Sequence, residues 1–235
     1  PIDETVEGIV NGIFFNQGHV CCAGSRLLLQ ENVAEEVLHK LKNRMEKIRV
    51  GDPLDKNTDL GAINSREQLN KINELSAAGD AEGAERWSPS CNLSDKGFWF
   101  APTVFTGVTQ AHRIAREEIF GPVLTIFVYE DSQFEESLRV VDGTSEYALT
   151  GSIMAKDRYA IDLATKALEN AAGNFYINDK PTGAVVGQQP FGGARGSGTN
   201  DKAGAAMNLL RWISARTIKE TFVTPTDYRY PFLEI

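Results

Sequence analysis

Phe14-Phe15-Asn16-Gln17-Gly18-His19-Val20-Cys21-Cys22-Ala23-Gly24-Ser25-Arg26 joins a predicted helix to a predicted strand, with two adjacent cysteines in the loop between them. Before this loop, apolar residues recur at the spacing of one helix face: Val6, Ile9, Val10, Ile13 and Phe14. Asp3 is a suitable N-cap for this helix, and Gly18 is a suitable stop. After the loop, residues 26–30 carry three consecutive leucines, which predicts a short buried strand.

Helices and strands alternate along the rest of the chain. Further helices are predicted at 32–48, with Asn32 as N-cap, and at 65–78, 134–141 and 157–172. Further strands are predicted at 98–105, 123–129, 149–155 and 174–178. Residues 79–97 are rich in Gly, Asp, Ser and Asn, which predicts a surface loop. Because hairpin signals are scarce, the pattern predicts an α/β fold with a mostly parallel, twisted sheet and flanking helices.

The end of the chain has a pattern of its own. Ile218, Thr221 and Val223 alternate well enough to predict an edge strand, and the aromatic residues Tyr228, Tyr230 and Phe232 follow. An aromatic terminal strand with few charges is a candidate for pairing with another subunit. The alternative is that it covers a surface of its own domain.

Composition narrows the class of protein. The chain has 235 residues, is 42% hydrophobic and carries a formal net charge of −8, which argues against non-specific binding of nucleic acid or anionic lipid. No apolar run approaches the roughly 20 residues of a membrane helix. Three cysteines are too few for a disulfide framework and indicate a reducing compartment. The chain opens Pro1-Ile2-Asp3, without Met or a leader, and is expected to be part of a longer protein.

Cys21 is a candidate nucleophile, because even an unperturbed thiol with a pKa of about 8.5 is partly ionised at neutral pH. Attack on a carbonyl carbon creates an oxyanion, which requires nearby N–H donors. The alternative is that Cys21 and Cys22 are small buried apolar residues. The pair lacks the spaced-ligand pattern of a metal centre, so no metal site is predicted.

The stretch from Phe14 to Arg26 resembles the catalytic-cysteine motif of the aldehyde dehydrogenases, with Cys21 at the position of the nucleophile. A second segment, Glu117-Glu118-Ile119-Phe120-Gly121-Pro122, resembles another motif of that family. The resemblance implies NAD as cofactor, with Glu118 holding the nicotinamide ribose hydroxyls and Phe120 packing beside the nicotinamide. It also implies cofactor contacts for Gln68 and Lys71, although the alternative is that both are solvated helix residues. Cys21 would form a thiohemiacetal with an aldehyde and then a thioester.

The third match is to one branch of the family, the Δ1-pyrroline-5-carboxylate (L-glutamate γ-semialdehyde) dehydrogenases. It runs through Gly173-Asn174-Phe175-Tyr176-Ile177-Asn178-Asp179-Lys180, Thr182-Gly183 and Gln188-Gln189-Pro190-Phe191-Gly192-Gly193-Ala194-Arg195. The resemblance implies that backbone N–H groups at Gly183 and Ala184 bind the α-carboxylate of the substrate and that Phe191 packs on its aliphatic part. Cys22 stands where this branch usually has a serine that also holds the carboxylate, and a thiol is a poorer donor.

The resemblance implies a catalytic domain at residues 1–210, truncated at its N-terminus, and a tail at 211–235 suited to oligomerisation. It places the general-base glutamate, the oxyanion-hole asparagine and most of the NAD-binding domain before residue 1. Residues 1–235 alone are therefore expected to be inactive, whereas the parent enzyme would oxidise glutamate semialdehyde in proline catabolism, as a homo-oligomer in the cytoplasm or mitochondrial matrix. Two alternatives are an aldehyde dehydrogenase of broader specificity and a non-catalytic interface domain.

Overall fold

The computed structural model describes residues 2–233, and its centre is a four-stranded sheet in the order β1-β4-β3-β2. The strands are β1 (Arg26–Gln30), β4 (Val123–Tyr129), β3 (Thr103–Thr106) and β2 (Glu85–Trp87). β1 and β3 both run parallel to β4, and β2 pairs antiparallel with β3 at the edge. The prediction of a mostly parallel α/β sheet is confirmed.

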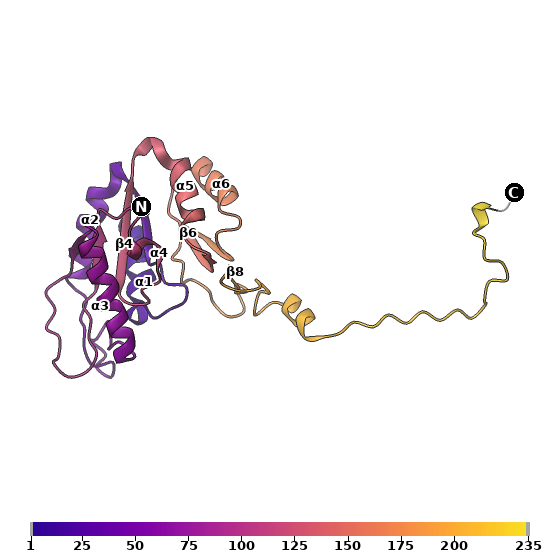
Figure 1. Ribbon diagram of the computed structural model, residues 1–235, viewed down its shortest axis with the longest axis horizontal. Helices are drawn as coiled ribbons and strands as arrows, with labels where there is room; N and C mark the ends of the chain where they lie inside the picture. Colours follow the sequence, from indigo (N-terminus) through magenta and orange to yellow (C-terminus); the bar gives the residue numbers. More distant parts are fainter. Residues whose placement is uncertain (1, 234–235) are drawn as a thin grey trace.

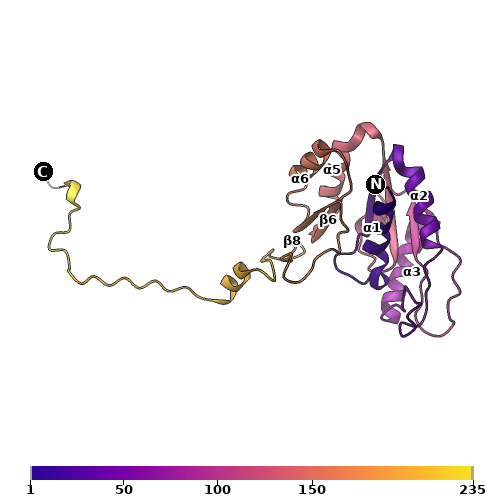
Figure 2. The same ribbon diagram turned by 180° about the vertical axis from the view of Figure 1, so that it is seen from behind.

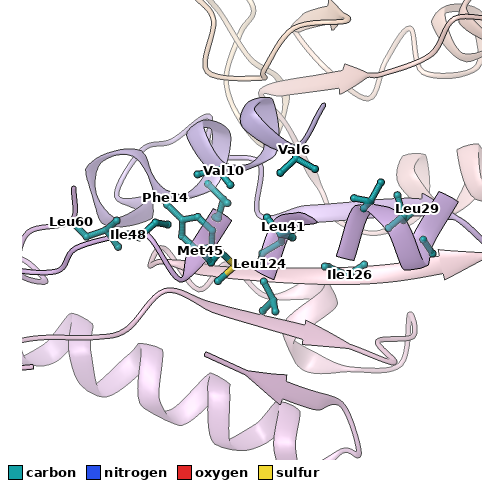
Figure 3. Close-up of a cluster of buried hydrophobic side chains, with 14 residues drawn as sticks. Val6, Val10, Phe14, Leu29, Leu41, Met45, Ile48, Leu60, Leu124 and Ile126 are labelled. Carbon is teal, nitrogen blue, oxygen red and sulfur yellow. The ribbon is translucent and has the colours of Figure 1, made fainter. Parts of the chain in front are cut away.

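Three long helices cover this sheet: α1 (Ile2–Phe14), α2 (Glu31–Met45) and α3 (Arg66–Ala81). α1 and α2 pack their apolar faces together against β4, as the side chains of Phe14, Leu41 and Ile126 illustrate (Figure 3). α3 contributes to a second buried cluster with β3 and with α4 (Arg113–Arg116). The core therefore fixes both ends of the loop that carries the two cysteines, because α1 precedes that loop and β1 follows it.

The later part of the chain adds a smaller layer. Helices α5 (Phe134–Gly143) and α6 (Arg158–Ala167) lie together beside β6 (Thr150–Ile153), on the other side of β4 from α2 and α3 (Figures 1 and 2). β6 pairs in parallel with β7 (Asn174–Ile177), and β5 (Tyr147–Ala148) pairs antiparallel with β8 (Ala194–Arg195). Short 3-10 helices occur at η1 (Phe15–Gly18), η2 (Asp131–Gln133), η3 (Ala206–Trp212) and η4 (Pro231–Leu233).

Several predicted boundaries are wrong for identifiable reasons. Asp3 lies inside the first turn of α1 and Asn32 inside α2, so neither is an N-cap. The start of α2 is capped from outside the helix, because Asp131 Oδ1 accepts from the Asn32 N–H (3.3 Å). Pro102 has no N–H to donate, and the strand predicted at 98–105 begins only after it, at Thr103. The predicted loop 79–97 contains β2, which pairs with β3. No local sequence pattern predicted this pairing.

The predicted terminal strand is also absent from the described residues. Beyond Trp212 the chain runs as an extended segment away from the body of the molecule (Figures 1 and 2) and pairs with no strand of residues 2–233. Phe222 and Tyr228 are 87% and 94% exposed, so the tail covers no other surface within residues 2–233. A strand requires a ladder partner, and the single chain offers none here. Residues 234 and 235 of the predicted tail lie outside the described residues.

Candidate active site

The loop carrying the cysteines and the loop 117–122 lie side by side because each leads into the amino end of a strand. Residue 25 precedes β1, Pro122 precedes β4, and the two strands are parallel neighbours with Arg26 opposite Thr125. Two motifs almost a hundred residues apart in sequence therefore meet at one edge of the sheet. The Ser25 carbonyl reinforces the junction by accepting from both the N–H (3.0 Å) and the hydroxyl (3.1 Å) of Thr125.

The two loops touch at a glycine. Gly18 has φ +70°, and a Cβ on it would lie 2.1 Å from the Gly121 carbonyl oxygen. Only glycine permits this backbone contact. Beside this contact, the ring of His19, which follows Gly18, stacks on the ring of Phe120, which precedes Gly121, with centroids 5.7 Å apart and planes 14° apart. Burial lowers the pKa of His19, so this ring is neutral at physiological pH.

The cysteines occupy the two central positions of a turn that is closed by the Ala23 N–H donating to the Val20 carbonyl (2.9 Å). Cys21 is exposed, whereas Cys22 is half-buried. Burial, together with the neighbouring Cys21, raises the pKa of Cys22, so that this thiol remains protonated. The Cys21 N–H makes no hydrogen bond within the described chain and is free to meet an oxyanion. Of the two thiols, the accessible one is therefore at the position that the family motif assigns to the nucleophile.

The two adjacent glutamates have different environments. Glu117 forms an ion pair with Arg113 (2.7 Å), which lowers the pKa of its carboxyl group. The exposed Glu118 makes no hydrogen bond or ion pair with any described residue, so both of its oxygens are available to a ligand. Arg26 holds the backbone just before this pair by donating to the carbonyls of Ala115 and Arg116.

Two glutamine side chains hold the two loops in place. Gln17, in the cysteine loop, binds the segment that precedes α3, and Gln68, on α3, binds loop 117–122. Gln17 donates to the Ala62 carbonyl (3.0 Å) and accepts from the Gly61 N–H (3.2 Å). Gln68 donates to the carbonyls of Ile119 (2.8 Å) and Phe120 (2.9 Å), where Phe120 holds the left-handed backbone conformation with φ +54°. The Gln68 amide nitrogen is thus engaged in positioning Phe120, and its oxygen alone remains for a cofactor.

Lys71 lies one turn further along α3 and is exposed. Its ammonium group makes no hydrogen bond or ion pair with residues 2–233, and its positive charge helps to lower the pKa of the Glu117 carboxyl group. This position is compatible with both roles predicted for Lys71, a contact with the cofactor and a solvated helix side chain.

The predicted carboxylate-binding loop follows β7 and packs on the cysteine loop through Pro181. A Cβ on Gly12 or Gly24 would lie 3.4 Å or 3.1 Å from the Pro181 ring. The N–H groups of Gly183 and Ala184 have no acceptor among residues 2–233. A pair of free N–H groups in a glycine-containing turn is suited to binding an anion. The segment is linked to the cysteines a second time, because the Thr150 hydroxyl on β6 donates to the Cys22 carbonyl (3.4 Å).

Phe191 is half-buried in a strand-like bridge with Ala203. Lys202 braces this region by donating to the carbonyls of Gly173 and Gly192 and to Asn174 Oδ1. The structure therefore orders the Phe191 segment, whose backbone hydrogen bonds go to Ala203, and within residues 2–233 no hydrogen bond joins Phe191 to Cys21 or to Gly183.

Sequence reasoning did not assign roles to Gln17, His19, Arg26 or Tyr176. The first three lie inside the cysteine motif, where their presence in a family segment was the available signal. Their function as loop ties depends on partners far along the chain and could not be inferred locally. Tyr176 sits in the branch-specific segment and contacts Gly183, as a Cβ on that glycine would lie 3.3 Å from its Cε1.

No cluster of three His, Cys, Asp or Glu side chains in the described part of the chain is arranged to hold a metal ion. None of the helices formed by residues 2–233 has the length and apolar character needed to cross a membrane.

Comparison with known proteins shows which family the chain belongs to. The model of the aldehyde dehydrogenase family matches residues 1–218. A relative named mitochondrial delta-1-pyrroline-5-carboxylate dehydrogenase, from Dictyostelium discoideum, is 47% identical over 99% of this chain, and the mouse protein of that name is 41% identical over 99%. The chain spans 42% of the length of each of these relatives.

Solved structures agree. The 1-pyrroline-5-carboxylate dehydrogenase from Thermus, with bound NAD, superposes with a TM-score of 0.80 at 41% identity, over 89% of this chain and 39% of that one. The delta-pyrroline-5-carboxylate dehydrogenase from Mycobacterium tuberculosis, bound with NAD and cobalamin, gives 0.82 at 42% identity, over 100% and 43%. With a family model covering nearly all of its length, and with its two motif loops joined at one sheet edge, this chain belongs to the aldehyde dehydrogenase family.

Proposed function

We propose that this chain carries the nucleophile, the ribose clamp and the substrate anchor of an enzyme that oxidises L-glutamate γ-semialdehyde to glutamate with NAD. The observation that carries the proposal is the placement of free N–H groups at Gly183 and Ala184 on a loop that packs, through Pro181, against the loop of Cys21. An anion-binding turn beside a nucleophilic thiol suits an aldehyde that carries a carboxylate at its other end. The names of the relatives agree with this substrate class.

In the proposed reaction the Cys21 thiolate attacks the aldehyde carbon and forms a thiohemiacetal. The free Cys21 N–H donates to the oxyanion that develops on the former carbonyl oxygen. A bound NAD would supply the acceptor for the hydride of this carbon, leaving the thioester on Cys21. Water then hydrolyses the thioester on Cys21, releasing the carboxylate and restoring the thiol. The Gly183–Ala184 turn holds the far end of the substrate, so that the aldehyde carbon stays within reach of Cys21.

The residues of loop 117–122 fit the nicotinamide riboside part of NAD. Glu118 offers a carboxylate that no described residue uses, and two vicinal hydroxyls are suitable donors to it. Phe120 presents an aromatic ring held by His19 and Gln68. Residues 1–235 alone are proposed to be inactive, because the family pattern supplies the general base and most of the NAD pocket from sequence outside them.

A substrate comparison tests the proposal. The kcat/KM for glutamate semialdehyde should exceed that for pentanal by about a hundredfold or more, because only the semialdehyde carries a charged acceptor for the N–H groups of Gly183 and Ala184. The measurement is the initial rate of NADH formation by the purified full-length natural protein. Equal values for the two aldehydes would favour the alternative, an aldehyde dehydrogenase of broader specificity.

Substitutions in the glutamate pair test the ribose clamp. Glu118→Ala should raise the KM for NAD by about tenfold to a hundredfold, because the ribose loses a charged acceptor. Glu117→Ala is the matched control: it removes the neighbouring carboxylate, which is engaged with Arg113, and should change that KM by less than about threefold. Equal effects of the two changes would contradict the assignment of the clamp to Glu118.

We propose that residues 211–235 pair with a second copy of the chain, which makes the enzyme a homo-oligomer. The support is the exposure of the apolar tail residues Ile218 (76%), Phe222 (87%) and Val223 (86%), which no element of the described chain covers. Three free cysteines agree with a reducing compartment, the cytoplasm or the mitochondrial matrix.

A further inference from the structure

The hydroxyl group of Tyr176 is buried without a partner. Tyr176 is 8% exposed and lies on β7, immediately before the anchor loop. Its hydroxyl oxygen makes no hydrogen bond with any residue from 2 to 233. Because buried polar groups are nearly always paired, such a hydroxyl requires a reason for its position.

The nearest polar side chain on the same strand does not supply that partner. Asn174 lies two residues earlier, and its side chain acts on Tyr176 as a hydrogen-bond donor that lowers the pKa of the hydroxyl, but no hydrogen bond of normal geometry joins the two, and such a donor would leave the O–H proton without an acceptor. Its amide, however, is engaged elsewhere: Nδ2 donates to the Pro190 carbonyl (3.0 Å), and Oδ1 accepts from the Gly192 N–H (3.1 Å) and from Lys202 (3.4 Å). Asp179 is also near: its Oδ1 accepts from the Lys180 N–H (2.8 Å), and its Oδ2 lies beside Gly183, 2.9 Å from the position of a Cβ there, without accepting a hydrogen bond from Tyr176.

The surroundings of Tyr176 are rich in unpaired donors. The edge of its ring contacts Gly183, where a Cβ would lie 3.3 Å from Tyr176 Cε1. Thr182, the preceding residue, carries a second buried hydroxyl that has no partner in the described chain. The free N–H groups of Gly183 and Ala184 complete the set. Several donors without a hydrogen-bond acceptor in the described chain are suited to binding an anion.

We propose that the Tyr176 hydroxyl donates a hydrogen bond to the carboxylate of the substrate and thereby sets the preference for a carboxylate-bearing aldehyde. This inference rests on the proposed function and adds a side-chain donor to the backbone anchor. Burial raises the pKa of Tyr176, so the hydroxyl keeps its proton and can donate. The hydroxyl also supplies what Cys22 cannot, since a thiol is a weak donor.

Tyr176→Phe tests this role, because it removes one oxygen and keeps the ring against Gly183. The kcat/KM for glutamate semialdehyde should fall by about tenfold to a hundredfold, mainly through KM, since one hydrogen bond to a charged group is lost. The kcat/KM for pentanal should stay within about twofold, because pentanal has no carboxylate. Binding of L-glutamate, measured by calorimetry, should weaken by the same factor as the semialdehyde reaction.

Tyr129→Phe is the matched control. Tyr129 lies on β4, outside the anchor region, and burial raises its pKa as it does that of Tyr176. This variant should leave the ratio of the two kcat/KM values unchanged. The melting temperature of Tyr176→Phe should not fall, because a hydroxyl without a partner contributes nothing to folding; a marked fall would contradict the unpartnered state.

The outcomes separate this inference from the proposed function. If the unmodified enzyme does not prefer glutamate semialdehyde over pentanal, both fail. If it has that preference and Tyr176→Phe retains it, the inference is wrong and the proposed function stands. An equal fall for both aldehydes would assign Tyr176 a purely structural role and would also overturn the inference.

Discussion

Cys21→Ser should lower kcat by about 10⁴-fold or more, because a serine hydroxyl ionises far less readily than a thiol and no basic side chain within residues 2–233 hydrogen-bonds to this position. Cys22→Ser should keep kcat within a few-fold, since Cys22 is half-buried and its raised pKa keeps it protonated. The serine would also restore a good donor beside the substrate, so the KM for glutamate semialdehyde should fall. Steady-state kinetics of the two variants of the natural protein provide the measurement.

Circular dichroism and melting temperature provide the folding control for both variants. Cys21 is exposed, so the change from sulfur to oxygen should leave the stability nearly unaltered. Turnover by Cys21→Ser at more than a few per cent of the normal rate would remove Cys21 from the nucleophile's role. A comparable loss of turnover in Cys22→Ser, with Cys21 intact, would transfer that role to its neighbour.

Gly18→Ala should have the largest effect outside the nucleophile. A methyl group there would lie 2.1 Å from the Gly121 carbonyl oxygen, and a backbone atom cannot rotate away. The added strain at φ +70° acts in the same direction. Together these effects should destabilise the protein by about 3 kcal/mol and separate the cysteine loop from loop 117–122. The resulting misplacement of the nucleophile relative to the cofactor should reduce kcat/KM by about a hundredfold.

Gly107→Ala separates strain from contact. Gly107 has φ +68°, almost the same as Gly18, but a Cβ placed on it would meet no atom within 4 Å. This variant should therefore lose only about 1–2 kcal/mol and retain its activity. Thermal unfolding monitored by calorimetry, together with initial rates, compares the pair. If Gly18→Ala were no worse than Gly107→Ala in both measurements, the close approach of the two loops would have no functional weight.

The sequence by itself predicted the elements that have strong local patterns. The strand at 123–129 is at the predicted position, and the helix predicted at 65–78 forms as Arg66–Ala81, because runs and periods of apolar residues act within a few residues. Ser65, predicted as the first helical residue, is the N-cap and accepts from the Gln68 N–H (3.1 Å). The motif loops around Cys21 and Glu118 could also be identified from sequence, since they are contiguous.

Only the tertiary structure decided how these pieces meet. The pairing of β1 with β4 places Cys21 and Phe120 at one sheet edge, and hydrogen bonds across a sheet are not encoded in the local pattern of either strand. The left-handed conformation of Phe120 could not be foreseen, because an aromatic residue adopts it only where its surroundings impose it, here through Gln68. The same holds for the tail, whose alternating pattern predicted a strand that requires a partner absent from the single chain.

The contrast between Glu117 and Glu118 follows the same rule. The sequence presents two identical carboxylates in succession, and the fold engages one with Arg113 and leaves the other without a hydrogen bond or ion pair among residues 2–233. The unpartnered hydroxyl of Tyr176 likewise became visible only when β7 was placed against the anchor loop. The sequence thus determined which chemical groups are present and which short elements carry them. The packing of distant segments decided which of those groups remain available to a ligand, because that depends on the partners each group finds in space.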